Sequence, residues 1–166
     1  IEADGKRLLY TGDFRLHGVR GNVMDKILER RVGTVDVVVT EGTTVSRSEH
    51  EVVTEWDLQK RVKAYLRQYK YVFVLCATTN LDRIFALARA VPRGKYCICD
   101  EYQKTLVKAV SDRWSSLSTF YQMPKLTTYG DNLLPGFQER GGLMFVRVNR
   151  KFERIIRQFD PQQSIL

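Results

Sequence analysis

The chain has 166 residues, enough for one or two small domains, and 43% of them are hydrophobic, enough to fill a core. With 27 Lys and Arg against 19 Asp and Glu, its formal net charge is +8, which favours a polyanionic partner. The longest apolar run, residues 71–77, is far too short to cross a bilayer, so no membrane association is expected.

Strands are predicted where short apolar runs lie between turn residues. The first turn is Asp4-Gly5, a two-residue hairpin signal that precedes an apolar run. Five strands are expected, at residues 7–11, 35–40, 71–76, 96–99 and 143–148. Residues 1–3 and 165–166 resemble parts of two further strands, so we expect the sequence to be a segment of a longer protein.

Four amphipathic helices are predicted, each preceded by a residue that can cap it. Ser48 and Glu51 have the spacing of a capping box at the start of a long helix. Asn80, Asp100 and Asn149 occupy the cap positions of the other three.

The order of these elements predicts the class of fold. Because strands alternate with helices, we expect an α/β fold with a mostly parallel sheet that is flanked by helices on both faces. Residues 115–142 contain several Pro and Gly residues, and we expect them to form a long irregular excursion.

Three cysteines, Cys76, Cys97 and Cys99, lie in apolar strand-like runs. An odd number of cysteines in such runs argues against a disulfide framework and for a reducing compartment, so we expect a cytoplasmic protein. Cys97 and Cys99 would share one face of a strand, which favours buried packing over metal binding because no other ligands are nearby in the sequence.

Three motifs stand out at predicted strand ends: LYTGDFRLHG at residues 9–18, DVVVTEGTT at residues 36–44 and CATTNLDR at residues 76–83. In this order they resemble landmarks of metallo-β-lactamase-fold hydrolases of the β-CASP group, most closely the ribonuclease J-like branch. The resemblance implies that residues 1–45 are a short remnant of the metallo-β-lactamase αββα domain, its C-terminal edge. Residues 46–166 would then be the inserted β-CASP-like domain. The sequence departs from the family because it lacks the histidine motifs, including H-x-H-x-D-H.

The resemblance implies a catalytic and metal-binding role for Asp13, which matches the strand-end aspartate that bridges two metal ions. A carboxylate suits that position because each of its oxygens can bind one cation. The implied cofactors are two divalent ions, zinc or manganese, in the parent protein, and none is expected in this chain alone. Without the resemblance, Thr11-Gly12-Asp13 is equally consistent with a turn in which Asp13 caps the following backbone.

The resemblance also implies a catalytic role for Glu41, which matches an acid at the end of the strand before the inserted domain. In the family this acid orients a catalytic histidine or shapes the site. Thr43 and Thr44 follow it and offer hydroxyl groups to phosphate oxygens. The alternative is that Glu41 begins a loop and that the two threonines form a turn.

Thr79, Asn80 and Arg83 are the remaining candidate substrate-binding residues. They follow a predicted strand and begin a helix, at the edge of an open parallel sheet where ligands usually bind and where backbone N–H groups favour an anion. The resemblance places an RNA phosphate there. In the alternative interpretation, Asn80 is a helix cap and Arg83 belongs to an ion pair.

Two further groups of residues have two interpretations each. A basic group near the C-terminus is either a track for a polyanion or a solvated outer face: Arg147, Arg150, Lys151, Arg154 and Arg157. Aromatic residues near the long excursion either stack on bases or pack in the core: Trp114, Phe120 and Tyr121.

We therefore expect part of a metal-dependent hydrolase that cleaves RNA phosphodiester bonds through a metal-bound hydroxide, with the isolated chain inactive. The expected partner is single-stranded RNA or another polyanion, and the parent protein is a candidate homodimer. Two alternatives stay open, because a fold does not determine a substrate. One is a non-catalytic nucleotide- or RNA-binding α/β module, and the other is a hydrolase of a small ester or thioester.

Overall fold

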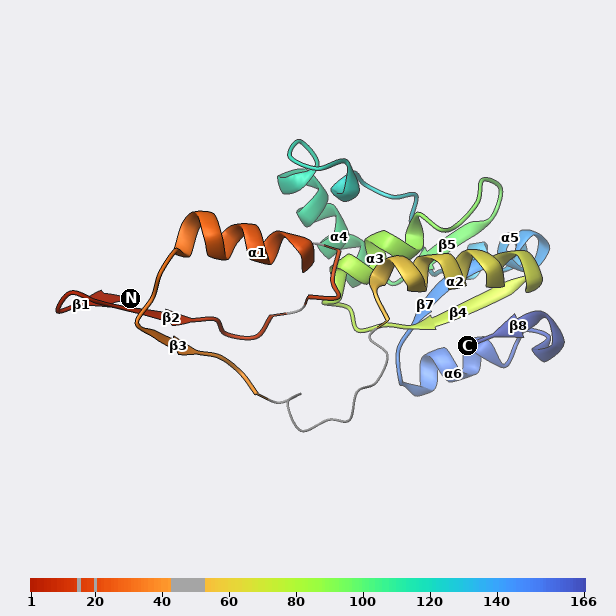
Figure 1. Ribbon diagram of the computed structural model, residues 1–166. Coiled ribbons are helices and arrows are strands. Elements are labelled where there is room, and N and C mark those ends of the chain that lie inside the picture. The colour runs from red at the N-terminus through yellow and green to blue at the C-terminus, as the bar shows by residue number, and fades with distance from the viewer. Residues whose placement is uncertain (15, 20, 43–52) are drawn as a thin grey trace. The chain divides into compact units, whose positions relative to one another are not determined.

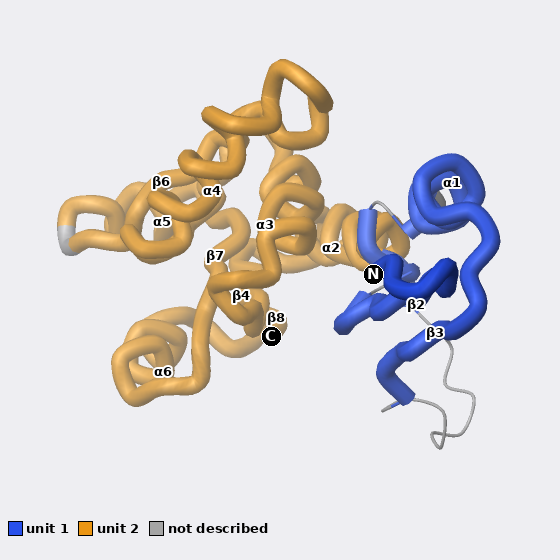
Figure 2. Tube along the Cα trace, turned by 90° about the vertical axis from the view of Figure 1, so that its left-hand side faces the viewer, with its two compact units in different colours: residues 1–54 blue, residues 55–166 orange. Residues whose placement is uncertain are grey.

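The computed structural model describes residues 1–14, 16–19, 21–42 and 53–166, and the chain divides into two compact units. Unit 1 is Ile1–Thr54 and unit 2 is Glu55–Leu166 (Figure 2). The predicted domain boundary between residues 45 and 46 lies outside the described residues, and so do Ser48 and Glu51 of the predicted capping box.

Unit 1 contains a three-stranded sheet with the strand order β1-β2-β3. β1 (Glu2–Ala3) pairs antiparallel with β2 (Lys6–Tyr10). The backbone φ is positive at both Asp4 and Gly5 between them, as a type I′ hairpin turn requires, so the predicted turn is confirmed. β3 (Val37–Val39) pairs parallel with β2.

A helical segment that the sequence analysis did not predict lies between β2 and β3. It comprises η1 (Gly21–Val23), α1 (Met24–Ile27) and η2 (Leu28–Val32). No described residue of unit 1 is buried, and Val38 in β3 is 55% exposed. Parallel strands are normally covered on both faces, so unit 1 has an apolar sheet without a hydrophobic core in its described part.

Unit 2 is built on a five-stranded sheet with the order β6-β5-β7-β4-β8, in which every pair of neighbours is parallel. The strands are β4 (Tyr71–Leu75), β5 (Tyr96–Cys99), β6 (Thr127–Thr128), β7 (Gly142–Val146) and β8 (Ser164–Ile165). The three longest are apolar and mostly buried, as expected of parallel strands with helices on both faces.

Helices cover both faces of this sheet, which confirms the predicted α/β class (Figure 1). One face packs against α2 (Glu55–Gln68), α3 (Leu81–Ala88) and α4 (Glu101–Trp114). The other face packs against α5 (Leu134–Arg140) and α6 (Arg150–Ile156). We call these the α3 face and the α6 face.

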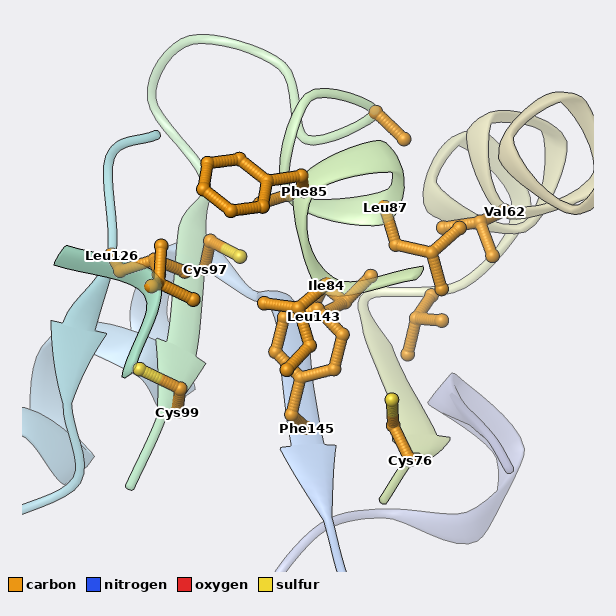
Figure 3. Close-up of a cluster of buried hydrophobic side chains, with 14 of the residues drawn as sticks. Val62, Cys76, Ile84, Phe85, Leu87, Cys97, Cys99, Leu126, Leu143 and Phe145 are labelled. Atoms are coloured by element: carbon orange, nitrogen blue, oxygen red, sulfur yellow. The ribbon is translucent and has the colours of Figure 1, made fainter. Parts of the chain in front are cut away.

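The core on the α3 face joins α3 to alternate residues of the strands. Ile84 and Phe85 of α3 are fully buried, and so are Leu143 and Phe145 of β7. Burying one such side chain stabilises the fold by roughly 1.5–3 kcal/mol. The three cysteines belong to the same cluster and are free thiols, so the prediction that they pack in the core is confirmed (Figure 3).

Two predicted helix caps are confirmed in unit 2. The Asp100 carboxylate accepts a hydrogen bond from the Gln103 backbone N–H at 2.8 Å, and the Gln103 side chain accepts one from the Asp100 N–H, which together form a capping box. Asn149 accepts a hydrogen bond from the Phe152 N–H at 3.0 Å at the start of α6.

The prediction that residues 115–142 form a long irregular excursion was correct only in part, since residues 115–118, 122–126 and 129–130 lie outside helices and strands. This segment contains η3 (Thr119–Tyr121), β6, η4 (Asp131–Leu133) and α5. The misleading signal was Pro135, which lies in the first turn of α5, where a helix tolerates a proline because that N–H has no intrahelical partner. A last short helix, η5 (Pro161–Gln163), precedes β8. In the described part of the chain, no helix combines the length and apolar character needed to cross a bilayer.

Candidate functional site

In unit 1, two acidic residues follow the carboxyl ends of neighbouring parallel strands. The Thr11 N–H donates to the Val39 carbonyl at 3.0 Å, and the hydroxyl oxygens of Thr11 and Thr40 lie 3.1 Å apart, within hydrogen-bond distance, so β2 and β3 end side by side. Asp13 follows β2 and Glu41 follows β3, and both residues are exposed. The structure therefore places both predicted catalytic acids after the ends of paired strands.

These two carboxylates do not form a complete metal site. A catalytic zinc ion needs three protein ligands and an open position. Among the described residues, no group of three or more His, Cys, Asp or Glu side chains is arranged to hold a metal ion. Thr43 and Thr44 lie outside the described residues. The part of unit 1 that the structure describes thus does not by itself fit a dinuclear metal centre.

In unit 2, two neighbouring strands are followed by helices on opposite faces of the sheet. β4 leads into α3 on one face, whereas its neighbour β7 leads into α6 on the other. In such an arrangement the two connections diverge and leave a crevice beyond the carboxyl ends of the strands, which is where open α/β sheets bind ligands. The candidate binding site of unit 2 is therefore the carboxyl edge of β4, β5 and β7.

The predicted residues Thr79 and Asn80 lie at this edge, between β4 and α3. Thr79 is exposed and Thr78 beside it is buried. Asn80 occupies the N-cap position of α3, but its side chain makes no capping hydrogen bond, and its backbone N–H donates to Ala77. Asn80 thus marks the helix start by its position alone, and its substrate-binding role stays a prediction.

Arg83 forms a two-pronged ion pair with Glu55, the first residue of α2. Its Nη2 and Nε lie 2.9 and 3.1 Å from the two carboxylate oxygens of Glu55. The Glu55 side chain is only 2% exposed, so the Arg83 guanidinium neutralises a buried charge and links α2 to α3. The alternative interpretation of Arg83 as an ion-pair residue therefore describes what the structure contains, and a role in substrate binding is untested.

Arg147, which directly follows β7, is a second cation at this edge in addition to Arg83. Its Nη2 lies 2.5 Å from a carboxylate oxygen of Asp100, which follows β5, and its Nη1 donates to the Thr78 hydroxyl at 3.4 Å. One side chain thus connects the ends of three strands. That Asp100 oxygen has no hydrogen-bond partner in the part of the chain that the structure describes, so its contact with Arg147 is an ion pair without hydrogen-bond geometry.

Two buried donors near this edge also lack a hydrogen-bond partner among the described residues: Nε of Arg147 and Nε2 of Gln103. Gln103 is fully buried, and its amide oxygen accepts the Asp100 N–H at the start of α4. A buried donor without a hydrogen-bond partner destabilises the folded state by about 1–3 kcal/mol. Binding of a ligand or water that offers an acceptor atom to these donors would therefore be favourable. The arrangement can bind an oxygen-rich group.

The aromatic residues and the basic C-terminal group have mixed surroundings. Phe120 and Tyr121 pack against Phe85 of α3, whereas Trp114 is 40% exposed beneath the Arg113 guanidinium. The basic residues of α6 and its end are exposed: Arg150, Lys151, Arg154 and Arg157. Core packing therefore accounts for two of the three aromatic residues.

Comparisons with protein families, with curated proteins and with solved structures each found no match to this chain. The sequence analysis missed the connecting role of Arg147, which it had grouped with the basic residues of α6. The available signal was its position directly after a buried strand and two residues before the cap residue Asn149.

Proposed function

We propose that this chain is part of a metal-dependent hydrolase that acts on phosphodiester bonds, with RNA as the substrate. The observation that carries the proposal is the position of Asp13 and Glu41 after the carboxyl ends of the paired parallel strands β2 and β3. The three motifs that resemble β-CASP hydrolases support it, and so does the net charge of +8.

In this proposal, Asp13 is one metal ligand and Glu41 orients a group that lies outside the described residues. Bound metal ions would supply an activated water and neutralise phosphoryl oxygens. The remaining ligands would come from other parts of the parent protein, so we expect the 166-residue chain to bind zinc weakly and to leave RNA uncut. Glu41 would remain in place without metal because it follows a paired strand.

The test is Asp13→Asn in the complete parent protein. Loss of a metal-binding carboxylate should lower RNA cleavage by at least about 100-fold and reduce the bound metal, measured by a cleavage assay and by elemental analysis. Asp4→Asn is the matched control, because Asn is as compatible as Asp with a type I′ turn. Unchanged cleavage by Asp13→Asn, or efficient RNA cleavage by the 166-residue chain alone, would refute the proposal.

A second candidate function is a non-catalytic module that binds nucleotides or single-stranded RNA at the carboxyl edge of unit 2. Arg147 favours it, because its unpartnered Nε lies beside the strand ends at which ligands usually bind. Binding of a uridine oligonucleotide should weaken steeply with salt, and Arg147→Gln should weaken it further. Salt-independent binding, or no effect of Arg147→Gln, would count against this function.

A further inference from the structure

A cavity lies at the amino-terminal end of β5. Thr78 and Arg147 lie at the opposite, carboxyl end of the sheet. Its volume is about 490 Å³, within the range of about 300–1,000 Å³ that is usual for pockets of small molecules. Its walls include three cations and several apolar residues, among them Arg93, Lys95, Lys125, Ala88, Val91 and Cys97. All of these residues belong to unit 2.

The charge around this cavity has one sign. Arg93, Lys95 and Lys125 line it, and a smaller adjoining cavity shares the two lysines and adds Arg140. No carboxylate lines either cavity, and among the described residues none of these cations has an ion-pair partner. Several basic residues around a cavity without an acidic one favour an anionic ligand.

Lys95 is held in place by the end of α2. Its ammonium group donates to the carbonyl oxygens of Leu66 and Tyr69 at 2.7 and 3.4 Å, which leaves one of its three N–H bonds for a ligand. Burial lowers the pKa of Lys95, so an anion beside it would stabilise its charged form. A fixed cation loses little freedom when a ligand binds.

The apolar part of the wall points to an organic ligand rather than a bare ion. Ala88 and Cys97 are buried and belong to the core of the α3 face, and Val91 packs against it. Gly94 has a φ of +89° and has open space where a side chain would be, so the turn before β5 leaves the opening clear. The uncharged, partly apolar part of such a ligand would contact this wall, and its anionic group would contact the cations.

We propose that this cavity binds a small organic phosphate. Arg93, Lys95 and Lys125 bind the phosphate group, and Ala88, Val91 and Cys97 contact the uncharged part of the ligand. The cavity lies at the opposite end of the sheet from the carboxyl edge, and neither Asp13 nor Glu41 lines it, so binding there requires neither a metal ion nor hydrolysis.

The test uses adenosine monophosphate as the probe and isothermal titration calorimetry on the 166-residue chain. Adenosine monophosphate should bind, whereas adenosine, which lacks the phosphate, should bind at least about tenfold more weakly. Arg93→Gln and Lys125→Gln should each weaken the binding of adenosine monophosphate by about tenfold, since each removes one charge-assisted contact. Both side chains are exposed, so these variants should fold normally.

Lys63→Gln is the matched control, because Lys63 is an exposed lysine of α2 that does not line the cavity. It should leave the affinity unchanged. The proposal is overturned if adenosine monophosphate does not bind, if adenosine binds equally well, or if Lys63→Gln weakens binding as much as Lys125→Gln. Tighter binding of a uridine oligonucleotide that depends on the same two residues would also overturn it, because the ligand would then be a polymer.

Discussion

At the scale of single residues, the ion pair between Glu55 and Arg83 is the clearest source of stability that can be tested. Arg83→Ala would leave the Glu55 carboxylate buried without its partner, so we expect the free energy of unfolding to fall by about 3 kcal/mol. Urea denaturation would measure the change. Arg61→Ala, which removes an exposed arginine from α2, the helix that contains Glu55, should change stability by less than about 0.5 kcal/mol.

A double variant separates loss of the pair from loss of packing. The double variant Glu55→Ala with Arg83→Ala should lower the free energy of unfolding by less than the sum of the two single variants. The reason is that the second substitution removes the charge that the first left without a partner. Additive effects would show that the two side chains do not stabilise each other.

The cysteine thiols predict how stability depends on pH. Burial raises the pKa of Cys76 to about 11 and that of Cys99 to about 12, from an ordinary value of 9.0. Above pH 9.0 the unfolded chain therefore releases protons that the folded chain keeps, and the free energy of unfolding should fall as the pH rises. The fall is at most about 1.4 kcal/mol per pH unit for each thiol.

Urea denaturation over this alkaline range would measure the effect, with Cys99→Ala as the comparison. That variant should lose stability less steeply with pH than the unaltered chain, because one raised pKa is gone. Equal slopes would mean that the Cys99 thiol does not contribute. Below the ordinary thiol pKa, the native chain should also react slowly with a thiol reagent, since the thiolate is the reactive form.

At the scale of elements, the start of β7 has no room for a side chain. Gly142 has a φ of +146°, and a Cβ there would lie 2.0 Å from the Tyr96 carbonyl oxygen. Gly142→Ala should therefore destabilise unit 2 by more than about 3 kcal/mol, from backbone strain and a clash with a neighbouring strand. Gly94→Ala, with a φ of +89° but open space, should cost only about 1–2 kcal/mol. Thermal unfolding of the two variants would show whether they differ in this order.

The cap of α6 gives a second test at this scale. Asn149→Ala removes the acceptor of the Phe152 N–H and should lower the free energy of unfolding by about 1 kcal/mol, measured by urea denaturation. Asn149→Asp keeps an acceptor and should be nearly neutral. A larger loss for Asn149→Asp than for Asn149→Ala would contradict the assignment of this cap.

The elements that the sequence predicted well carry strong local signals. Asp4-Gly5, Asp100 and Asn149 act within a few residues of themselves, so their effects could be predicted without the tertiary structure. α5 was missed because Pro135 and Gly136 look like helix breakers, whereas burial of Phe137 against the α6 face stabilises the helix. The carboxyl edge was predicted only in part, because it depends on the strand order.

Strand order is the information that the local patterns lacked. Thr78, Asp100 and Arg147 are far apart in the sequence, and they meet only because β7 lies between β5 and β4. The cavity at the other end of the sheet was missed for the same reason, since Lys95 and Lys125 come from separate connections. The predicted metal and RNA roles of Asp13, Glu41, Thr79 and Asn80 remain predictions.

At the scale of the whole molecule, the two units should differ in stability. Unit 2 has buried clusters on both faces of its sheet, whereas no described residue of unit 1 is buried. We expect the backbone amides of β4, β5 and β7 to be protected in hydrogen exchange and those of β2 and β3 to exchange quickly. Equal protection in the two units would contradict this expectation.

The β3 strand has a consequence for how the chain behaves at high concentration. It is the outer strand of its sheet, its three valines are each at least 41% exposed, and one row of its backbone N–H and C=O groups faces no strand in the described structure. Another molecule can add a strand to such an exposed edge strand through backbone hydrogen bonds. Fibrillar oligomers that bind thioflavin should therefore form from concentrated samples, and a lysine in place of Val38 should suppress them.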